Sequence, residues 1–489
     1  MAGTRLGAAL AAAFVVIGSG AVSLLCFPPS AGAHGSLAPK TDLPIPEWLF
    51  AWGAALVLIV SFVALSIAWR EPRFEGAKWR PTGDLLSRLL LNRPLEILAG
   101  AVGVFLLGVT VWAGLYGSTS PEKNFSITFV FVTFYLVIAF LSAFLGDLFR
   151  PFNPWRAAAR ALAGLVSAIT RRPPPQALPY PERLGRWPAV AGLAAFLWLE
   201  LAYGIPLEPV VVIDPRTVAI AALVYSAYSF VGMALFGIEQ WCRRGETFSV
   251  FFGMFASLSP LEVRDGRFGR RPWFSGAVGW GIVPGSIAFV LVAIAGTAFD
   301  GAAEGLLSGA IDGLYELINP DFEVQGDVVA RRISTSTFML ATLGVVAAIY
   351  WAGISGMGTE GSGQSRRELG RSFVHCFIPI AFAYLFAHYF SLVYYQEQAQ
   401  FTYLLTDPLG AGQDFAENPI DLSLSSNLLW YVQVGSLVAG HVAALAMGHD
   451  KALAIYPSLR RASQSQYWML ALMVSFTVLG LMLLSAANE

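Results

Sequence analysis

The sequence predicts an all-α fold, a polytopic helical bundle in which about ten transmembrane helices follow a cleavable signal peptide. The 489 residues are 56% hydrophobic and only 13% charged, whereas a water-soluble domain carries about 25% charged residues. Apolar runs long enough to cross a hydrocarbon core of about 30 Å recur along the whole chain. The basic residues also gather in alternate loops, as membrane topology requires.

The N-terminus has the three parts of an export signal. Arg5 supplies a positive charge, residues 6–25 form an apolar core, and Ala31-Gly32-Ala33 is a cleavage site of the A-x-A type. We therefore expect a signal peptide over 1–33 and a single polytopic domain over 34–489. The alternative is an uncleaved first helix, because the apolar core is long enough to span a membrane.

Ten apolar segments follow the signal. Only a helix satisfies its own backbone inside lipid, so each segment is predicted to be a helix. They lie near 47–69, 94–116, 125–147, 187–203, 217–240, 277–298, 335–353, 372–395, 427–447 and 466–486.

The connections between these spans are predicted to be loops, with one exception. Residues 155–170 alternate Arg with Ala, Leu and Val, which predicts a short amphipathic helix on the membrane surface. The turn before it, which contains Pro and Asn residues, is predicted to have a structural role, with Asp147 paired to Arg150 or Arg156.

The orientation follows from the basic residues. A cleaved signal leaves the mature N-terminus outside, and the inner loops then hold 25 of the 31 Lys and Arg residues against 5 in the outer segments. This excess is the positive-inside pattern, and ten spans return the C-terminus to the outside. The preference for Arg over Lys and the abundant Ala are typical of a GC-rich bacterial genome. We therefore expect a multi-pass protein of the bacterial inner membrane.

Four of the five histidines lie in or beside the eighth and ninth spans. A histidine inside lipid usually faces the bundle interior and marks a functional site, although it can also be a packing residue bonded to a carbonyl. The helical rise places His375 near the depth of His441 and His449, so these three can form an inner site for haem or a metal. His388 has no histidine at its depth, so a two-haem ladder is not predicted. We expect water to reach the ring of His449.

His388 lies toward the outer leaflet, at the predicted depth of Asp300 and Glu200. Tyr384 and Tyr395 share its helix face. Histidine and carboxylate groups that converge can bind a divalent metal such as zinc or manganese and activate water. We therefore predict His388, Asp300 and Glu200 as catalytic residues and His388 as a metal ligand. The alternative for Asp300 is a helix-end residue at the interface.

The fifth histidine, His34, becomes the first mature residue if cleavage follows Ala33. Its α-amine and imidazole nitrogens together suit Cu(II), so His34 is a candidate metal ligand. The alternative is an ordinary terminal residue without a ligand role.

Several segments occur together in a way that resembles a known family. They are Asp42-Leu-Pro44-Ile-Pro46-Glu-Trp48, Phe149-Arg150 with Asn153-Pro154-Trp155-Arg156, Thr297-Ala-Phe-Asp300-Gly301, Gly440-His441 with Gly448-His449-Asp450, and Ser465-Gln466-Tyr467-Trp468. Over nearly the whole mature chain the sequence resembles the bacterial membrane proteins called fenitrothion hydrolases. The family name implies hydrolysis of the P–O-aryl bond of a phosphotriester. The resemblance brings no catalytic residues with it.

Three functional classes are compatible with the sequence. The first is a membrane-bound hydrolase of organophosphate triesters that uses metal-activated water. The second is a copper-binding or haem-binding membrane protein that uses the span histidines. The third is a transporter or a non-catalytic membrane factor. The expected partners are the lipid bilayer and a small apolar substrate, with no nucleic acid, and the sequence does not predict an oligomeric state.

Overall fold

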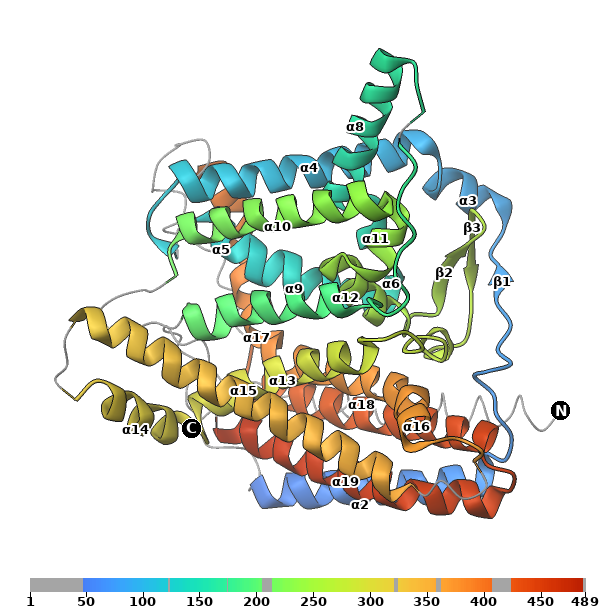
Figure 1. Cartoon of the computed structure of the whole chain (residues 1–489). Helices are drawn as coiled ribbons and strands as arrows, with labels where there is room; N and C mark the ends of the chain where they lie inside the picture. Colours follow the sequence, from blue (N-terminus) through green and yellow to red (C-terminus); the bar gives the residue numbers. More distant parts are fainter. Residues whose placement is uncertain are drawn as a thin grey trace.

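The computed structural model describes residues 47–121, 124–173, 175–204, 213–320, 324–357, 362–406 and 424–486. The predicted signal peptide and His34 lie outside these residues. Figure 1 shows a bundle of helices that run in roughly one direction, with a small sheet at one end. The described part of the chain is therefore an all-α helical bundle, as predicted.

The elements follow one another along the chain as helices with one short sheet. They are α2 (Glu47–Ala68), β1 (Arg80–Pro81), α3 (Asp84–Leu90), α4 (Arg93–Tyr116), α5 (Phe125–Thr128), the π-helix η2 (Phe129–Val137), α6 (Ile138–Leu145), α7 (Phe149–Phe152), α8 (Pro154–Thr170), α9 (Trp187–Trp198), the π-helix η3 (Leu199–Tyr203), α10 (Pro215–Phe236), α11 (Ile238–Arg244), α12 (Thr247–Ala256), β2 (Leu261–Arg264), β3 (Arg267–Arg270), the 3₁₀ turn η4 (Ser275–Ala277), α13 (Ser286–Glu304), α14 (Ser308–Ile318), α15 (Val324–Gly356), α16 (Arg366–Phe373), the 3₁₀ turn η5 (Val374–Phe377), α17 (Ile378–Thr406), α18 (Ser426–Ile455) and α19 (Leu459–Ala486). The strands pair antiparallel in the order β1-β3-β2.

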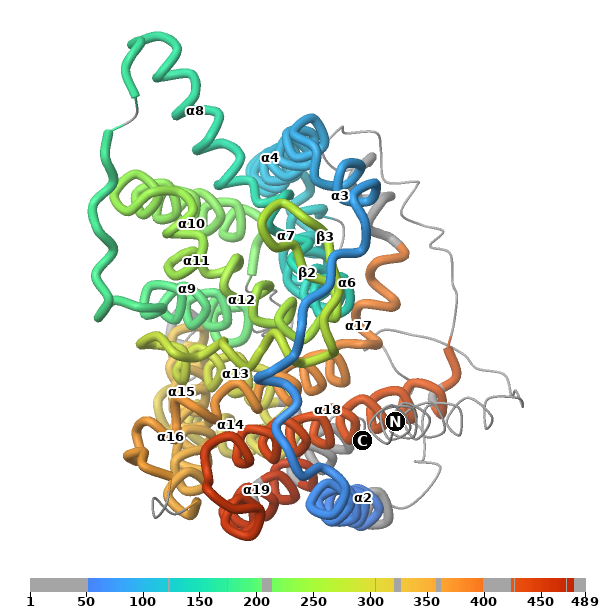
Figure 2. The backbone as a smooth tube through the Cα atoms, turned by 90° about the vertical axis from the view of Figure 1, so that its right-hand side faces the viewer, coloured from blue at the N-terminus to red at the C-terminus, as the bar shows by residue number. Residues whose placement is uncertain are grey.

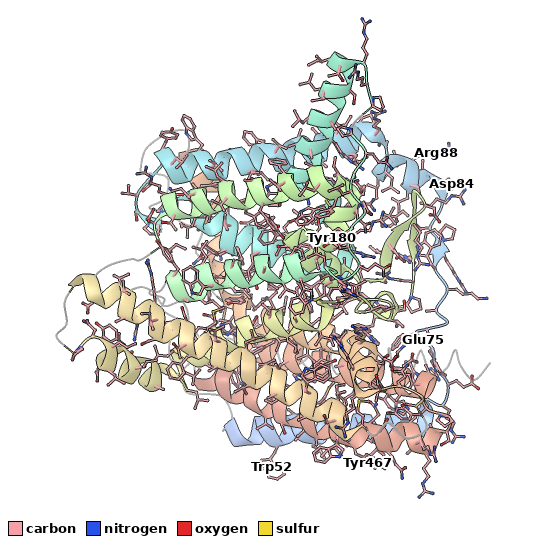
Figure 3. All side chains as sticks on the ribbon, in the orientation of Figure 1. Trp52, Glu75, Asp84, Arg88, Tyr180 and Tyr467 are labelled. Carbon is pink, nitrogen blue, oxygen red and sulfur yellow. The ribbon has the colours of Figure 1, made fainter. Side chains whose placement is uncertain are left out.

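Each of the ten predicted spans overlaps helical structure, although the sixth starts late and the fifth ends early, at Phe236. Seven helices of the described chain are long and apolar enough to cross a membrane, namely those at Arg93–Tyr116, Phe125–Leu145, Pro215–Phe236, Ser286–Ala303, Asp327–Gly356, Arg366–Gln398 and Asn427–Ile455. Apolar side chains also cover the outside of the bundle. Trp52 is 71% exposed, and Figure 3 shows it with Tyr467 along one outer edge. The chain is therefore a multi-pass membrane protein.

The sixth helix departs from the prediction, which placed it over 277–298. In the structure α13 begins only at Ser286, after an irregular segment. Gly281 and Gly285 have φ angles of +120° and +82°, outside the helical region. A side chain at Gly285 would also come within 2.8 Å of the Trp187 backbone nitrogen. This segment is a tight turn that packs against the start of α9.

The predicted inner loop 241–276 is also structured. It contains the end of α11, all of α12 and the hairpin of β2 and β3. Helix α12 is deeply buried, and Phe251, Phe252 and Phe255 are among the largest fully buried side chains of the described chain. It was missed because its ten residues are about half the length that a span requires.

The loops predicted to lie inside gather at one end of the bundle. Figure 1 shows α3 and the three strands at one end and α14 at the opposite end, and Glu75, Asp84 and Arg88 are labelled at the first of these ends in Figure 3. We call the end that carries α3 and the three strands the basic end. There, Arg156 pairs with Glu239 at 2.8 Å and with Glu96 at 3.0 Å. Asp147 was predicted to pair with Arg150 or Arg156, and it accepts a hydrogen bond from the backbone nitrogen of Arg150 at 3.2 Å, so the Arg150 alternative is the one that the structure has.

Glu246 organises the same end from inside. It is fully buried, and its carboxylate accepts hydrogen bonds from the Asn153 side chain, the Tyr225 hydroxyl and the backbone nitrogens of Phe248 and Ser249. The two backbone bonds cap the start of α12. One carboxylate therefore joins the turn before α8, helix α10 and helix α12.

The ends of α2 and α18 are joined in a similar way. Asp450 accepts hydrogen bonds from the Trp69 indole at 2.9 Å and from the backbone nitrogens of Arg73 and Phe74. Helix α2 packs on α18 and α19, and α17 packs on α18. Figure 2 shows α13 and α17 between this group and the group that contains α4 and α10. The middle of the molecule, where the site lies, is thus enclosed by helices on both sides.

Candidate functional site

The side chain of His388 meets a carboxylate in the middle of the bundle. His388 Nε2 lies 2.8 Å from Asp300 Oδ2, and the Tyr389 hydroxyl donates to the same oxygen at 2.7 Å. A carboxylate only accepts hydrogen bonds, so Nε2 of His388 carries the proton and Nδ1 is the basic nitrogen of the neutral ring. This is the arrangement in which an acid orients a histidine for proton transfer.

Two helices hold these groups. Asp300 lies on α13. In the membrane-spanning part of α13, 72% of the residues are buried, the largest share among the seven candidate spans of the described chain. His388 and Tyr389 lie on α17, which packs against α13. Gly301 of α13 lies beside the same ring, because a Cβ there would be in ordinary van der Waals contact with it, 3.4 Å from His388 Cε1 and 3.6 Å from His388 Nδ1.

Two π-helical segments bring further polar groups to the site. Tyr135 lies on η2 and Glu200 lies on η3. Tyr135 interacts electrostatically with both Glu200 and Asp300, and so does Tyr389. π-Helical segments are rare and often occur at functional sites. Two such segments, each with a polar side chain that interacts with Asp300, indicate a functional site.

Glu200 is incompletely satisfied. Within the described residues, its buried Oε2 atom has no hydrogen-bond partner. Glu200 also interacts electrostatically with Asp300, and two neighbouring negative charges in a low-dielectric interior are costly. The pair therefore requires a proton or a bound ligand to balance its charge.

The predicted meeting of His388 and Asp300 is confirmed by the 2.8 Å contact. Glu200 belongs to the same cluster through its interaction with Asp300, without a hydrogen bond to His388 in the described chain. Tyr389 and Tyr135 were not predicted from the sequence. Tyr389 is the neighbour of His388 and lies on a different side of the helix from Tyr384, the tyrosine singled out from the periodicity, so helix-face reasoning passed over it.

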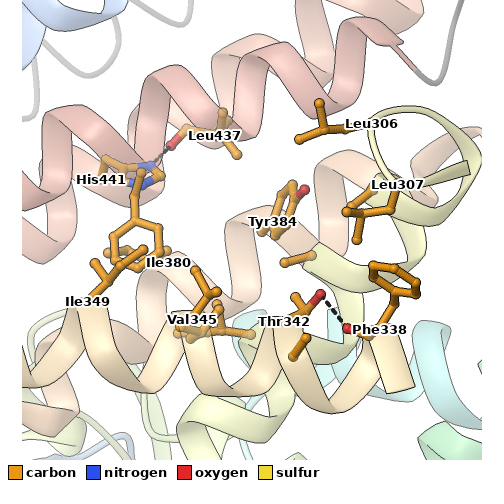
Figure 4. Close-up of a pocket in the computed structure, with 16 residues that line it drawn as sticks. Leu306, Leu307, Phe338, Thr342, Val345, Ile349, Ile380, Tyr384, Leu437 and His441 are labelled. Atoms are coloured by element: carbon orange, nitrogen blue, oxygen red, sulfur yellow. Dashed lines mark hydrogen bonds between the residues drawn. The ribbon is translucent and has the colours of Figure 1, made fainter. Parts of the chain in front are cut away.

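An apolar chamber of about 410 Å³ adjoins this cluster. Figure 4 shows residues of α13, α15, α17 and α18 around it, among them Tyr384 and His441. Tyr384 lies one turn before His388, and their ring centroids are 6.4 Å apart. A Cβ at Gly301 would also lie 3.5 Å from the Tyr384 hydroxyl. Tyr384 and Gly301 therefore connect the chamber to the His388 ring.

The three inner histidines each have their own surroundings. His375 Nε2 lies 3.6 Å from Cys376 Sγ, His441 Nδ1 lies 2.8 Å from the Leu437 carbonyl, and His449 Nε2 lies 3.0 Å from the Trp69 carbonyl. His449 is completely buried. The expectation that water reaches its ring is therefore wrong, because the end of α2 covers it.

Metal binding was predicted from several of these groups. Among the residues that the structure describes, no group of three or more His, Cys, Asp and Glu side chains is placed to hold a metal ion. The His388 cluster brings together one histidine and two carboxyls, of which Glu200 does not reach the shared hydrogen bond.

Comparisons with known proteins give no family. The chain matches no protein-family model, no curated protein and no solved structure. The fold and the site thus define a class only, a multi-pass α-helical membrane protein with a histidine–carboxylate pair inside the bundle. Its function has to be argued from that pair and from the chamber beside it.

Proposed function

We propose that this chain is a bacterial inner-membrane hydrolase that cleaves small apolar esters, with aryl phosphotriesters as the substrate class. The observation that carries the proposal is the 2.8 Å contact between His388 and Asp300 beside an apolar chamber. A histidine oriented by a carboxylate is the usual general base for activating water. The resemblance to the fenitrothion hydrolases supports the choice of substrate.

In the proposed reaction, His388 Nδ1 takes a proton from a water molecule, and the resulting hydroxide attacks phosphorus. The P–O-aryl bond breaks, and the aryl oxide takes the proton back from His388. Triester and water thus become diester and aryl alcohol. Asp300 stabilises the imidazolium that forms in between, and the Tyr389 hydroxyl holds Asp300 in place through its 2.7 Å hydrogen bond.

The proposed topology places the basic end in the cytoplasm, with a signal peptide, ten spans and both mature ends outside. It is supported by the excess of Arg and Lys in the loops of that end. Single cysteines at positions 160, 268 and 365 would then be shielded from an impermeant thiol reagent in intact spheroplasts. Labelling of all three from outside would reverse the orientation.

The direct test is hydrolysis of an aryl dialkyl phosphotriester that releases 4-nitrophenol, with purified full-length protein in nanodiscs. His388→Ala should lower the rate by about 100-fold to 10,000-fold, because it removes the base. The matched control is His449→Gln, a buried histidine of α18 that does not line the chamber, and it should keep the wild-type rate. Equal rates in the wild type and His388→Ala would refute the proposal.

A proton-coupled transporter is the second candidate. A specific observation favours it, since a further polar pair lies where α17 meets η2: the Thr133 hydroxyl donates to Glu397 at 2.6 Å. Carboxyls within a membrane bundle can act as proton relays. Substrate-driven proton uptake into proteoliposomes, with no hydrolysis product, would favour this candidate.

Metal analysis of the purified protein separates the remaining classes. Stoichiometric zinc or manganese that is lost in His388→Ala would mean that a metal ion, and not His388 alone, activates the water in the proposed reaction. Copper or a Soret absorption band would favour the copper-binding or haem-binding alternative that uses His375, His441 and His449.

A further inference from the structure

The chamber beside the proposed site contains a histidine that the reaction does not use. His441 is 2% exposed, and in the described chain its Nε2 atom is buried without a hydrogen-bond partner. His441 lines the chamber together with apolar side chains of four other helices. An unpaired polar atom in such surroundings is costly unless a ligand pairs with it.

The tautomer of His441 follows from its other ring nitrogen. Nδ1 lies 2.8 Å from the carbonyl oxygen of Leu437, one turn earlier on α18, and Figure 4 shows this bond. A carbonyl only accepts, so Nδ1 carries the proton. Nε2 of the neutral ring then carries a lone pair and accepts. The ligand atom that pairs with it must be a donor such as a hydroxyl.

A second unpaired group lies in the same chamber. The Tyr384 hydroxyl is buried and has no hydrogen-bond partner among the described residues. Figure 4 shows His441 toward one end of the chamber and Leu307 toward the other, with Tyr384 between them. Phe338 and Phe476 add aromatic walls. These features suit a flat apolar molecule with one donor group and room for a second polar atom.

The chamber also has an entrance on the outside of the bundle. Leu306 and Val345 line it and are 68% and 54% exposed. Both lie in a multi-pass bundle whose outer faces are apolar, so this entrance opens toward lipid. Its volume of about 410 Å³ falls within the range of small-molecule sites, about 300–1,000 Å³.

We infer that the chamber binds a lipid-soluble aromatic alcohol whose hydroxyl donates a hydrogen bond to His441 Nε2. The Tyr384 hydroxyl is available to a second polar atom of the same molecule. Binding at this site requires no hydrolysis, so the inference can be tested independently of the proposed function. It assigns His441 to ligand recognition and His388 to proton transfer.

The test compares two probes, 1-naphthol and its methyl ether, which share the naphthalene ring; in the ether a methyl group replaces the donor hydrogen. Their binding to the full-length protein in nanodiscs is measured by equilibrium dialysis, with partition into empty nanodiscs subtracted. The wild type should bind 1-naphthol about tenfold more tightly than the ether, the value of one well-placed hydrogen bond. This comparison needs no variant, so a folding defect cannot obscure it.

Variants then locate the hydrogen bond. His441→Phe keeps a ring in place but should bind both probes equally, whereas the matched control His449→Phe should keep the tenfold preference. Equal binding of both probes to the wild type, or absence of saturable binding, would overturn the inference. So would a preference that survives in His441→Phe, or a Soret band or bound copper that disappears with it.

Discussion

Two glutamates of the described chain occupy contrasting surroundings. Glu246, at the basic end, accepts hydrogen bonds from two side chains and two backbone nitrogens. Glu200, in the middle of the bundle, has a buried oxygen without any such partner within the described residues and interacts with a second carboxyl, Asp300. A satisfied buried network makes a structure rigid, whereas an unsatisfied one has a cost that function can explain.

The same contrast holds for the other charged groups of the two regions. At the basic end, Arg156 has two carboxylate partners and Arg160 shares both of them. At the site, the Tyr384 hydroxyl and Glu200 Oε2 have no partner in the described chain. Charged residues alone therefore do not mark the site in this protein. The site differs in holding a buried carboxyl oxygen, Glu200 Oε2, without a hydrogen-bond partner in the described chain and next to a second carboxyl, Asp300.

The largest effect is expected from Glu246→Ala. The substitution leaves the Asn153 side chain, the Tyr225 hydroxyl and two backbone nitrogens without their acceptor. We expect the free energy of unfolding to fall by about 3–5 kcal/mol, seen as a lower apparent melting temperature of the purified protein. Glu368→Ala, in the exposed capping box of α16, is the control and should change it much less. Similar melting temperatures for both variants would mean that the buried network is not structural.

The matching substitution at the site is Glu200→Gln. Because Oε2 of Glu200 has no partner to lose, we expect the free energy of unfolding to change by less than about 1 kcal/mol. The rate of phosphotriester hydrolysis should nevertheless fall about tenfold or more, since the charge balance around Asp300 changes. Both quantities are measured on one preparation. A loss of stability as large as that of Glu246→Ala would end the distinction between the two regions.

The smallest expected effect concerns acid stability at the basic end. Burial alone would raise the pKa of Glu239, but the hydrogen bond and charge of Arg156, with Arg160 and Arg150, hold that pKa below its ordinary value. A lowered pKa stabilises the fold above the unfolded pKa of about 4.3, and this contribution is lost as the pH falls through the lowered folded value. Its size is below about 1 kcal/mol, because the Glu239 side chain is 37% exposed and water screens it.

Melting curves of the wild type and Glu239→Gln from pH 7 to pH 3 check this expectation. The wild type should be the more stable at pH 7, and the difference should shrink below about pH 4.3. A difference that stays constant over the whole range would contradict the role assigned to the Glu239 charge.

Hydropathy predicted the positions of the long helices because lipid imposes a simple length on each of them. It failed where that length does not apply. Residues 277–285 are apolar, yet the positive φ angles of Gly281 and Gly285 prevent a helix there. Helix α12 is too short to be predicted as a span, although most of its side chains are buried in the core of the bundle.

The site was predictable only in part. Depth along two helices was sufficient to bring His388 to Asp300, because both residues lie in regular helices with a known rise. Helical rise and periodicity could not select Tyr389 over Tyr384, since that choice depends on how α17 is rotated against α13. Nor could they show that Nε2 of His441 is left without a partner, because that depends on the side chains of several helices at once.

The π-helical segment η2 has a consequence for how this chain tolerates length changes. Its closing bond runs from the Ile138 nitrogen to the Thr133 carbonyl, five residues back instead of four. The segment therefore stores more residues per turn than the α-helices on either side. Loss of a single residue here would turn all of α6 by about 100° about its axis. The number of residues between Tyr135 and α6 therefore fixes which face of α6 is buried. Substitutions leave this number unchanged, whereas insertions or deletions change it.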